Sequence, residues 1–194
     1  MMRKAVAVRR EEIVKAALQQ IRERGIAGVR AADVAKALDV STALVFYHFG
    51  TLEALIIEAF RQATETALAT LRDELNRGGR VETRLNAVLT LYGPTNPAHN
   101  WQLWIEAQAA AMRDQELRAV LQRLDKRWRD AVVALITEGV AAGVFTCEDP
   151  DGAAWRLTSL LDGLAVQVVA RTGTVTEADC ARWVGQAVAR ELGS

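Results

Sequence analysis

The sequence predicts an all-α protein: an N-terminal three-helix bundle with a helix-turn-helix, followed by a larger C-terminal helical domain, about nine helices in all. Three observations lead to this prediction. Apolar residues recur at steps of three and four through most of the chain, strand-like alternation is scarce, and glycines stand where helical stretches end. The 194 residues are enough to bury a core without disulfides or metals.

Three short helices are expected in the N-terminal quarter, over about residues 10–24, 31–38 and 41–48. Asp39 and Val40 make a tight turn, and Ser41 is a good N-cap for the third helix. The small side chain of Ala35 stands where the third helix would pack across the second. Phe49-Gly50 ends the third helix, so the region predicts two short helices joined by a short polar turn.

A longer helical region follows. Thr51 is the expected cap of a fourth helix that continues to the glycine pair at 78–79, and its apolar stripe includes Leu55, Phe60 and Leu71. The remaining expected helices span about residues 81–92, 98–112, 115–142, 152–171 and 177–192. There is no internal repeat and no Gly/Ser linker, so we expect the fourth helix to join the two parts of the chain directly.

The composition excludes several classes of protein. No stretch of about eighteen uncharged apolar residues is present, which argues against a membrane span, and the basic N-terminus is not followed by a signal-peptide pattern. Cys147 and Cys180 are isolated, which favours reduced thiols in a cytoplasmic protein. With only His48 and His99 as histidines, we expect no metal site and no cofactor.

Charge is unevenly distributed along the chain. Residues 1–50 carry nine Lys or Arg against five Asp or Glu, a net charge of +4, so the other 144 residues carry −4. A basic head on an acidic body suits a protein that binds a polyanion. The alternative is an ordinary solvated face, which charge alone does not exclude.

A helix-turn-helix places its second helix in the major groove of DNA. Val40 and Val45 should face the core, which leaves an outward face with Thr42, Ala43, Tyr47 and His48. Threonine can bond base edges or phosphates, alanine can touch a thymine methyl group, and tyrosine and histidine can donate to phosphates. Phe46 and Phe49 are predicted to be core residues. The alternatives are a core role for Tyr47 and a structural hydrogen bond for His48.

The segment from Gly28 to Leu55, GVRAADVAKALDVSTALVFYHFGTLEAL, resembles the N-terminal signature of TetR-type repressors. This resemblance implies a homodimeric, cytoplasmic transcription regulator that binds a pseudo-palindromic operator in double-stranded DNA. It also implies a domain division into a DNA-binding domain at 1–50 and a ligand-binding and dimerisation domain at 51–194. Release from the operator by a small-molecule inducer follows from the same resemblance.

The segment departs from the family pattern at three positions. Arg30 stands where a Ser or Thr usually caps the second helix, Phe46 replaces a tyrosine, and Leu52 replaces a lysine that commonly pairs with a phosphate. Arginine cannot cap, but it could reach a phosphate, and each lost phosphate contact weakens binding. We expect binding then to depend more on a set of basic residues: Arg3, Lys4, Arg9, Arg10, Arg30 and Lys36. The expected DNA-contact set is Arg30, Lys36, Ser41, Thr42, Ala43, Tyr47, His48 and Thr51.

Tryptophans distinguish the C-terminal body. Their spacing fits a small-molecule pocket and an ordinary aromatic core equally well, and the resemblance to TetR-type repressors implies the pocket. The expected ligand site comprises Trp101, Trp104, Gln108, Met112, Trp128, Trp155 and Asp162. The Trp-rich central helix is followed by further motifs: Gly139, Gly143-Val144-Phe145, Asp149-Pro150 and Leu161-Asp162-Gly163-Leu164. Together they resemble, more loosely, the choline-responsive-repressor type of C-terminal domain. A cation held by Trp faces and by Glu106 or Asp162 is one possibility, and pairing of Asp162 with Arg156 or Arg171 is the other.

The last two expected helices carry broad apolar faces, with Gly163 permitting close approach. Two such helices from each protomer would form an isologous four-helix interface. The symmetry would set two recognition helices about 34–36 Å apart. The expected interface residues are Leu157, Leu161, Leu164, Val168, Trp183, Val184 and Val188.

Two other classes of function compete with a regulator. An enzyme is disfavoured, because the chain shows no clustered His, Cys and carboxylate set, no Gly-rich phosphate loop and no nucleophile elbow. A protein-interaction adaptor with a weakened DNA-binding head is the alternative, motivated by Arg30 and Leu52.

Overall fold

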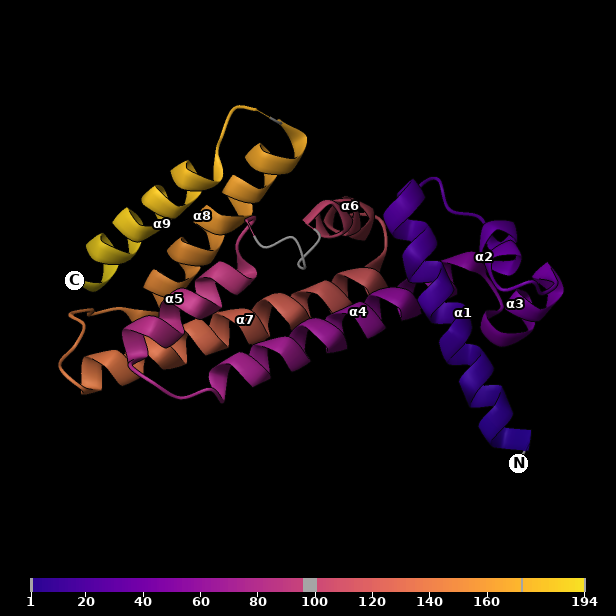
Figure 1. Ribbon diagram of the computed structural model, residues 1–194, viewed down its shortest axis with the longest axis horizontal. Helices are drawn as coiled ribbons and strands as arrows, with labels where there is room; N and C mark the ends of the chain where they lie inside the picture. The colour runs from indigo at the N-terminus through magenta and orange to yellow at the C-terminus, as the bar shows by residue number, and fades with distance from the viewer. Residues whose placement is uncertain (1, 96–100, 172, 194) are drawn as a thin grey trace. The chain divides into compact units, whose positions relative to one another are not determined.

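The structure is a computed structural model that describes residues 2–95, 101–171 and 173–193, with side chains from Val6 onward. This part of the chain contains nine helices and no strand, which confirms the all-α prediction (Figure 1). The helices are α1 Met2–Arg24, α2 Ala31–Ala37, α3 Thr42–Phe49, α4 Leu52–Leu75, α5 Val81–Tyr92, α6 Trp101–Ala111, α7 Gln115–Ala141, α8 Pro150–Ala170 and α9 Glu177–Leu192.

The helix bounds agree with the expected ones at most ends. The first helix begins eight residues before the expected start at Arg10, because the preceding Ala, Lys and Arg residues favour a helix without belonging to its apolar stripe. The helix expected from residue 98 is described from Trp101, since residues 98–100 lie outside the described part. α8 begins at Pro150, a residue type favoured in the first turn.

The residues group into two compact units. The first comprises residues 1–66 and 103–122, and the second comprises residues 67–102 and 123–194. These units do not divide at residue 50, because the first part of α4, most of α6 and the start of α7 group with the N-terminal helices. The domain division at 50/51 stays a prediction.

In the first unit, α2 packs against both α1 and α3. Ile13, Val34 and Val45 form the centre of this bundle and are almost fully buried. Ala35, 3% exposed, occupies the position where a small side chain was expected. The bundle therefore fixes which side of α3 faces outward.

Local hydrogen bonds define both ends of α3. The Ser41 Oγ accepts from the Leu44 amide at 3.2 Å, and Asp39, in the preceding turn, has a φ of +51°. At the other end Gly50 has a φ of +75°, which favours glycine. The Thr51 Oγ1 then accepts from the Ala54 amide at 3.1 Å and caps α4. The expected caps at Ser41 and Thr51 are confirmed.

In the second unit, α8 and α9 lie side by side (Figure 1). Asp149 caps α8, and Thr176 and Asp179 form a reciprocal capping box at the start of α9. A Cβ at Gly139 would lie 2.1 Å from the Phe145 ring, so this position of α7 requires glycine. Apolar side chains of α5, α7 and α8 form the core of this unit, including Leu85, Leu89, Leu135, Leu157 and Leu161.

No single helix in the described ranges is long and apolar enough to cross a membrane. The pair α3 and α4 meets that length and composition only when the two helices are joined across a 70° bend.

Candidate DNA-binding face and ligand cluster

One side of α3 is exposed. Tyr47 is 77% exposed, Ala43 is also exposed and Thr42 is half-buried, whereas Val45 on the opposite side is 1% exposed. The structure therefore brings Thr42, Ala43 and Tyr47 to one face, as the spacing predicted. Hydroxyl, methyl and phenol groups together can contact base edges, thymine methyl groups and phosphates.

His48 lies at the edge of this face. It is half-buried, and its ring makes an edge contact with Tyr47, with ring centroids 5.3 Å apart. Its backbone oxygen accepts from the Arg10 Nη1 at 3.2 Å. A phosphate contact through the His48 ring stays a prediction.

Phe46 was predicted to be a core residue, and the structure shows that this prediction was wrong. The Phe46 side chain is 42% exposed, because one step along α3 from the buried Val45 turns it by about 100° toward the outward side. Phe49 is half-buried, and the Arg10 guanidinium lies over its ring at 4.3 Å from the centroid.

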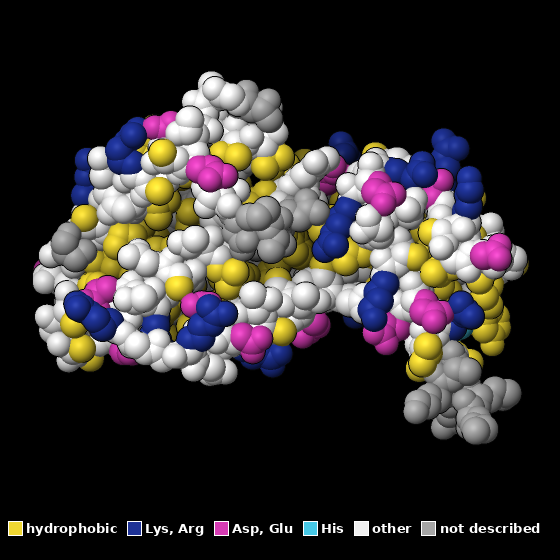
Figure 2. Space-filling view, viewed as in Figure 1, with side chains coloured by type: hydrophobic (Ala, Val, Ile, Leu, Met, Phe, Trp, Pro, Cys, Tyr) yellow, Lys and Arg dark blue, Asp and Glu magenta, His cyan; other side chains and the backbone are white. Residues whose placement is uncertain are grey.

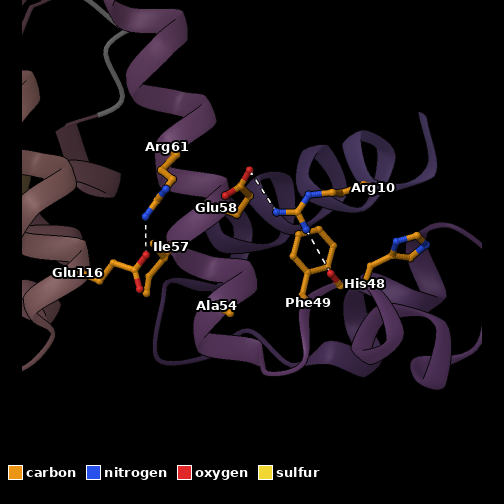
Figure 3. Close-up of a pocket in the computed structure, with 8 residues that line it drawn as sticks. All are labelled: Arg10, His48, Phe49, Ala54, Ile57, Glu58, Arg61 and Glu116. Carbon is orange, nitrogen blue, oxygen red and sulfur yellow. Dashed lines mark hydrogen bonds and ion pairs between the residues drawn. The ribbon is translucent and has the colours of Figure 1, made fainter. Parts of the chain in front are cut away.

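A groove of about 330 Å³ adjoins the C-terminal end of α3 within the first unit (Figure 3). Arg10 reaches into it from α1, bonds to the His48 backbone oxygen and pairs with Glu58 of α4 at 3.4 Å. Arg61 of α4 pairs with Glu116 of α7 in the same groove. Arg10 thus contacts α3, the Phe49 ring and α4, which makes it a positioning residue for α3.

The other basic residues near the N-terminus on which DNA binding was expected to depend differ in their surroundings. Arg9 pairs with Glu12 at 2.8 Å. The side chains of Arg3 and Lys4 lie outside the described ones. On the visible face of the first unit, the Lys and Arg side chains are spread over the surface and interspersed with acidic side chains (Figure 2).

Arg30 precedes α2, is exposed and makes no side-chain cap, as expected for arginine. The Asp33 carboxylate instead accepts from the Arg30 amide at 3.1 Å and also lies 3.5 Å from the Arg24 guanidinium. Lys36 is exposed on the same helix, so both cations could reach a phosphate. Leu52 is half-buried and supplies no charge at the start of α4.

Glu106 of α6 binds the turn between α1 and α2. Its Oε2 accepts from the Ile26 amide at 2.8 Å, and a Cβ at Gly25 would lie 2.7 Å from the same oxygen. On the same helix, the Trp104 ring makes an edge contact with Phe60 of α4, with centroids 5.9 Å apart. From Leu103 onward, α6 therefore packs with the N-terminal helices of the first unit.

Three aromatic rings converge in the second unit. The Tyr92 ring lies 5.5 Å from Trp101 and 5.2 Å from Trp128 between centroids, and all three side chains are buried. The Trp101 Nε1 donates to the Tyr92 backbone oxygen at 3.1 Å. The Tyr92 hydroxyl donates to the Asp162 Oδ1 at 2.6 Å, which links the rings to a carboxylate on α8.

Two carboxylates and one guanidinium interact at these rings. Burial and the charge of Asp162 raise the pKa of Asp125 to about 6, against the opposing effect of Arg129. Burial also raises the pKa of Asp162, although the Tyr92 bond and Arg129 act in the opposite direction. Burial and Asp162 raise the pKa of Tyr92, so its phenol keeps its proton. With both carboxylates ionised, these residues carry one uncompensated negative charge. We call Tyr92, Trp101, Asp125, Trp128 and Asp162 the aromatic–acid cluster.

The cluster contains only part of the expected ligand site. Trp104 packs on Phe60 in the first unit. Gln108 is exposed and Met112 is 69% exposed beyond the end of α6, because the buried stripe of that helix continues through Ala107 and Ala111 instead. Trp155 is 49% exposed, with the Arg129 guanidinium over its ring at 3.6 Å. These positions contradict an enclosed site that includes Gln108, Met112 and Trp155.

Sequence reasoning missed Tyr92, Asp125 and Arg129. In the sequence, Tyr92 only marks the end of the helix before Gly93. A tyrosine at a helix end can also be buried in the core, as Tyr92 is. Asp125 precedes the buried Trp128 by three residues and so lies on the same side of α7. That spacing was a signal, although acidic residues at such positions are more often solvated.

The expected dimer interface also needs a correction. Leu157, Leu161 and Leu164 are buried within the protomer, so their side chains belong to its own core. Trp183 is 37% exposed, while Val168, Val184 and Val188 are half-buried. The alternative pairing of Asp162 with Arg156 is wrong as well, because Arg156 pairs with Glu191 at 2.6 Å and with Asp149 at 3.7 Å.

An apolar groove of about 430 Å³ lies between the C-terminal end of α5 and helices α8 and α9, where hydrophobic side chains are visible at the surface (Figure 2). Its lining includes Leu89, Pro94, Leu161 and Val184, and the buried Cys180 thiol. In the described part of the chain, no three His, Cys, Asp or Glu side chains come together in a way that could hold a metal ion.

Comparison with known proteins agrees with this arrangement. Residues 13–59 match the family described as bacterial regulatory proteins of the tetR family, and residues 81–193 match the C-terminal domain of BetI-type transcriptional repressors. The chain is 27% identical over 170 residues to the transcriptional regulator BetI of Rhizobium meliloti, covering 82% of this chain and 77% of that protein. It is also 27% identical over 160 residues to the regulator CymR of Pseudomonas putida, covering 80% and 77%.

A transcriptional regulator from Saccharomonospora viridis, solved in complex with choline, has the same fold. Its TM-score is 0.89 at 26% identity, with 96% of this chain and 98% of that chain covered. A TetR regulator from Haloarcula marismortui shares the fold at a TM-score of 0.86 and 23% identity, over 96% and 99% of the two chains.

The fold and the exposed recognition helix define a transcriptional regulator with a DNA-binding helix-turn-helix and a ligand-binding helical domain. Because the C-terminal match spans more than half of the sequence, the chain belongs to the TetR family of bacterial regulators, with a C-terminal domain of the BetI repressor type.

Proposed function

We propose that this chain is a dimeric cytoplasmic repressor that a small organic cation, of the quaternary ammonium kind, releases from its operator. The aromatic–acid cluster carries this proposal. Its rings present the negative faces that attract a cation, and its two carboxylates outnumber the neighbouring arginine by one charge. The related regulator that binds choline supports the same class of ligand. The proposal assigns no catalytic step to the chain.

We assign the protein–DNA contacts to two groups of side chains. Thr42, Ala43 and Tyr47 contact base edges in the major groove. The exposed Arg30 and Lys36, with Ser41, His48 and Thr51 at the helix ends, contact phosphates and set the register of the head on the duplex.

The dimer interface is assigned to the exposed sides of α8 and α9. Trp183 and Val166 are exposed there, and added Cβ atoms at Gly163 and Gly185 would meet nothing within 4 Å in the protomer. Small and apolar residues on two neighbouring helices suit an isologous four-helix interface.

Release requires that the cation bind the DNA-free conformation more tightly than the DNA-bound one. By linkage, DNA must then weaken cation binding by the same factor. The change in free energy comes from the difference in contacts between the two conformations, so a ligand without that difference would not release the operator.

The test uses the full chain and a duplex selected from genomic fragments by the purified protein. Choline is titrated against the complex in a gel shift, with its uncharged carbon isostere, 3,3-dimethylbutanol, as the control. We expect choline to stabilise the protein against heat and to lower its DNA affinity, and the isostere to do neither to the same extent.

The variants Asp162→Asn and Tyr92→Phe should weaken choline binding while leaving DNA affinity unchanged in the absence of choline. Tyr47→Ala or Thr42→Ala should remove operator selectivity and leave the dimer intact. If choline and its isostere act equally, the cationic ligand class is wrong. If the purified chain ignores DNA even in low salt, an interaction adaptor replaces the regulator.

A further inference from the structure

Phe46 has an exposed ring that none of the assigned DNA contacts uses. Its side chain is 42% exposed on α3, in a bundle whose other large apolar side chains are mostly buried. Single exposed apolar residues are common on protein surfaces and need no function. This one, however, lies on the helix whose outward side enters the major groove.

The geometry of α3 places Phe46 inside the reading face. At about 100° per residue, positions 42, 43, 46 and 47 share one side of the helix. The buried Val45 is turned toward the bundle, and the half-buried His48 and Phe49 lie at the two edges of this side. Around the helix axis Ala43 lies between Phe46 and Tyr47, so two exposed aromatic rings flank the alanine.

The chemistry of the ring restricts what it can recognise. A phenyl ring has no donor or acceptor, so it cannot hold a phosphate or bond a base edge. In the major groove, the apolar group that distinguishes one base pair from the others is the C5 methyl of thymine. We propose that Phe46 is a specificity-determining residue that packs on a thymine methyl group in each operator half-site. The inference rests on the proposed operator binding.

A double-mutant cycle tests this contact. The selected operator is synthesised with deoxyuridine replacing thymidine one position at a time, symmetrically in both half-sites, which removes only the methyl group. Each duplex is titrated with the native chain, Phe46→Ala and Phe46→Tyr, the last of which keeps the ring. Met112→Ala is the matched control, since it removes an exposed apolar side chain that lies outside α3 and outside the assigned dimer interface.

For the native chain we expect uridine at one position to lower affinity about fourfold per half-site, the factor for one buried methyl-sized group. Phe46→Ala should bind the uridine and thymidine duplexes equally at that position. Phe46→Tyr and Met112→Ala should keep the native discrimination.

The inference is overturned if, at every position, deoxyuridine lowers the affinity of the native chain and of Phe46→Ala by the same factor. It is also overturned if deoxyuridine at no position lowers the affinity of the native chain. Those outcomes leave operator binding standing. A selection that yields no preferred duplex would instead overturn the proposed function, and this inference with it. Far-UV circular dichroism of each variant, with its thermal midpoint, separates loss of the contact from loss of the fold.

Discussion

Arg10→Met removes the guanidinium that holds the end of α3 and keeps most of the aliphatic stem. Three interactions are lost: the bond to the His48 backbone oxygen at 3.2 Å, the contact over Phe49 at 4.3 Å and the pair with Glu58 at 3.4 Å. A hydrogen bond from a charged donor contributes about 1.5 kcal/mol or more. The ring contact contributes about 0.5 kcal/mol, and the half-exposed pair less than about 1 kcal/mol.

The loss should therefore total about 2 kcal/mol, which lowers the thermal midpoint by about 4–8 °C in a chain of this length. Affinity should fall on every DNA sequence, because α3 is no longer held against α1 and α4. The dependence of affinity on salt should not change, since no phosphate contact is removed. Thermal unfolding and fluorescence anisotropy at four or five salt concentrations measure both quantities.

Arg30→Met is the matched comparison, because Arg30 is exposed and assigned to a phosphate. Its stability should be close to that of the native chain, and the slope of log affinity against log salt should fall by about 1.8 for two copies. Arg61→Met controls for the loss of an exposed ion pair in the same groove. The reasoning is refuted if Arg10→Met flattens the salt slope as Arg30→Met does and leaves the thermal midpoint unchanged.

Three further predictions follow from the two units. The raised pKa of Asp125 means that the folded chain holds a proton which the unfolded chain releases. The contribution of Asp125 to the free energy of unfolding should therefore fall as pH rises from 3.8 to about 6, and choline affinity should rise over the same range; with Asp125→Asn both changes should be smaller but not absent, because burial also raises the pKa of Asp162. Glu106→Ala should lower the urea midpoint, because the Ile26 amide loses its acceptor, whereas Glu106→Gln, which keeps a carbonyl oxygen, should stay near the native value. Gly163→Glu should give monomers in sedimentation without loss of protomer stability, while Gly139→Ala should destabilise the protomer; a Gly163→Glu dimer would contradict the assigned interface.

The N-terminal helix-turn-helix region was predictable in detail because the residues that define its helix ends act on their near neighbours in the sequence. Ser41, Thr51 and Gly50 act within three or four residues of themselves, through caps and a positive φ. The bounds of α5 and α9 followed from apolar periodicity in the same way. Phe46 was the exception, since an aromatic type suggested burial while its helical phase pointed outward.

The ligand cluster was only partly predictable because it depends on contacts distant in the sequence. The bond between Tyr92 and Asp162 joins residues 70 positions apart, and neither local pattern indicates the other. In α6, a buried stripe that begins with Trp101 and Trp104 can continue through either residue 107 or residue 108, since both lie on the same side of a helix as the two tryptophans. Tertiary packing selected the stripe that continues through Ala107 rather than Gln108.

The cap of α2 has a consequence for how this head could diverge from its relatives. The Asp33 carboxylate accepts from the Arg30 amide and pairs with Arg24, and the Asp33 amide donates to the Arg30 backbone oxygen. None of these bonds uses the side chain at position 30, so this position can vary in charge without loss of the helix, whereas the acid at position 33 is needed. Divergence at one DNA-facing position thus depends on a neighbour that need not touch DNA.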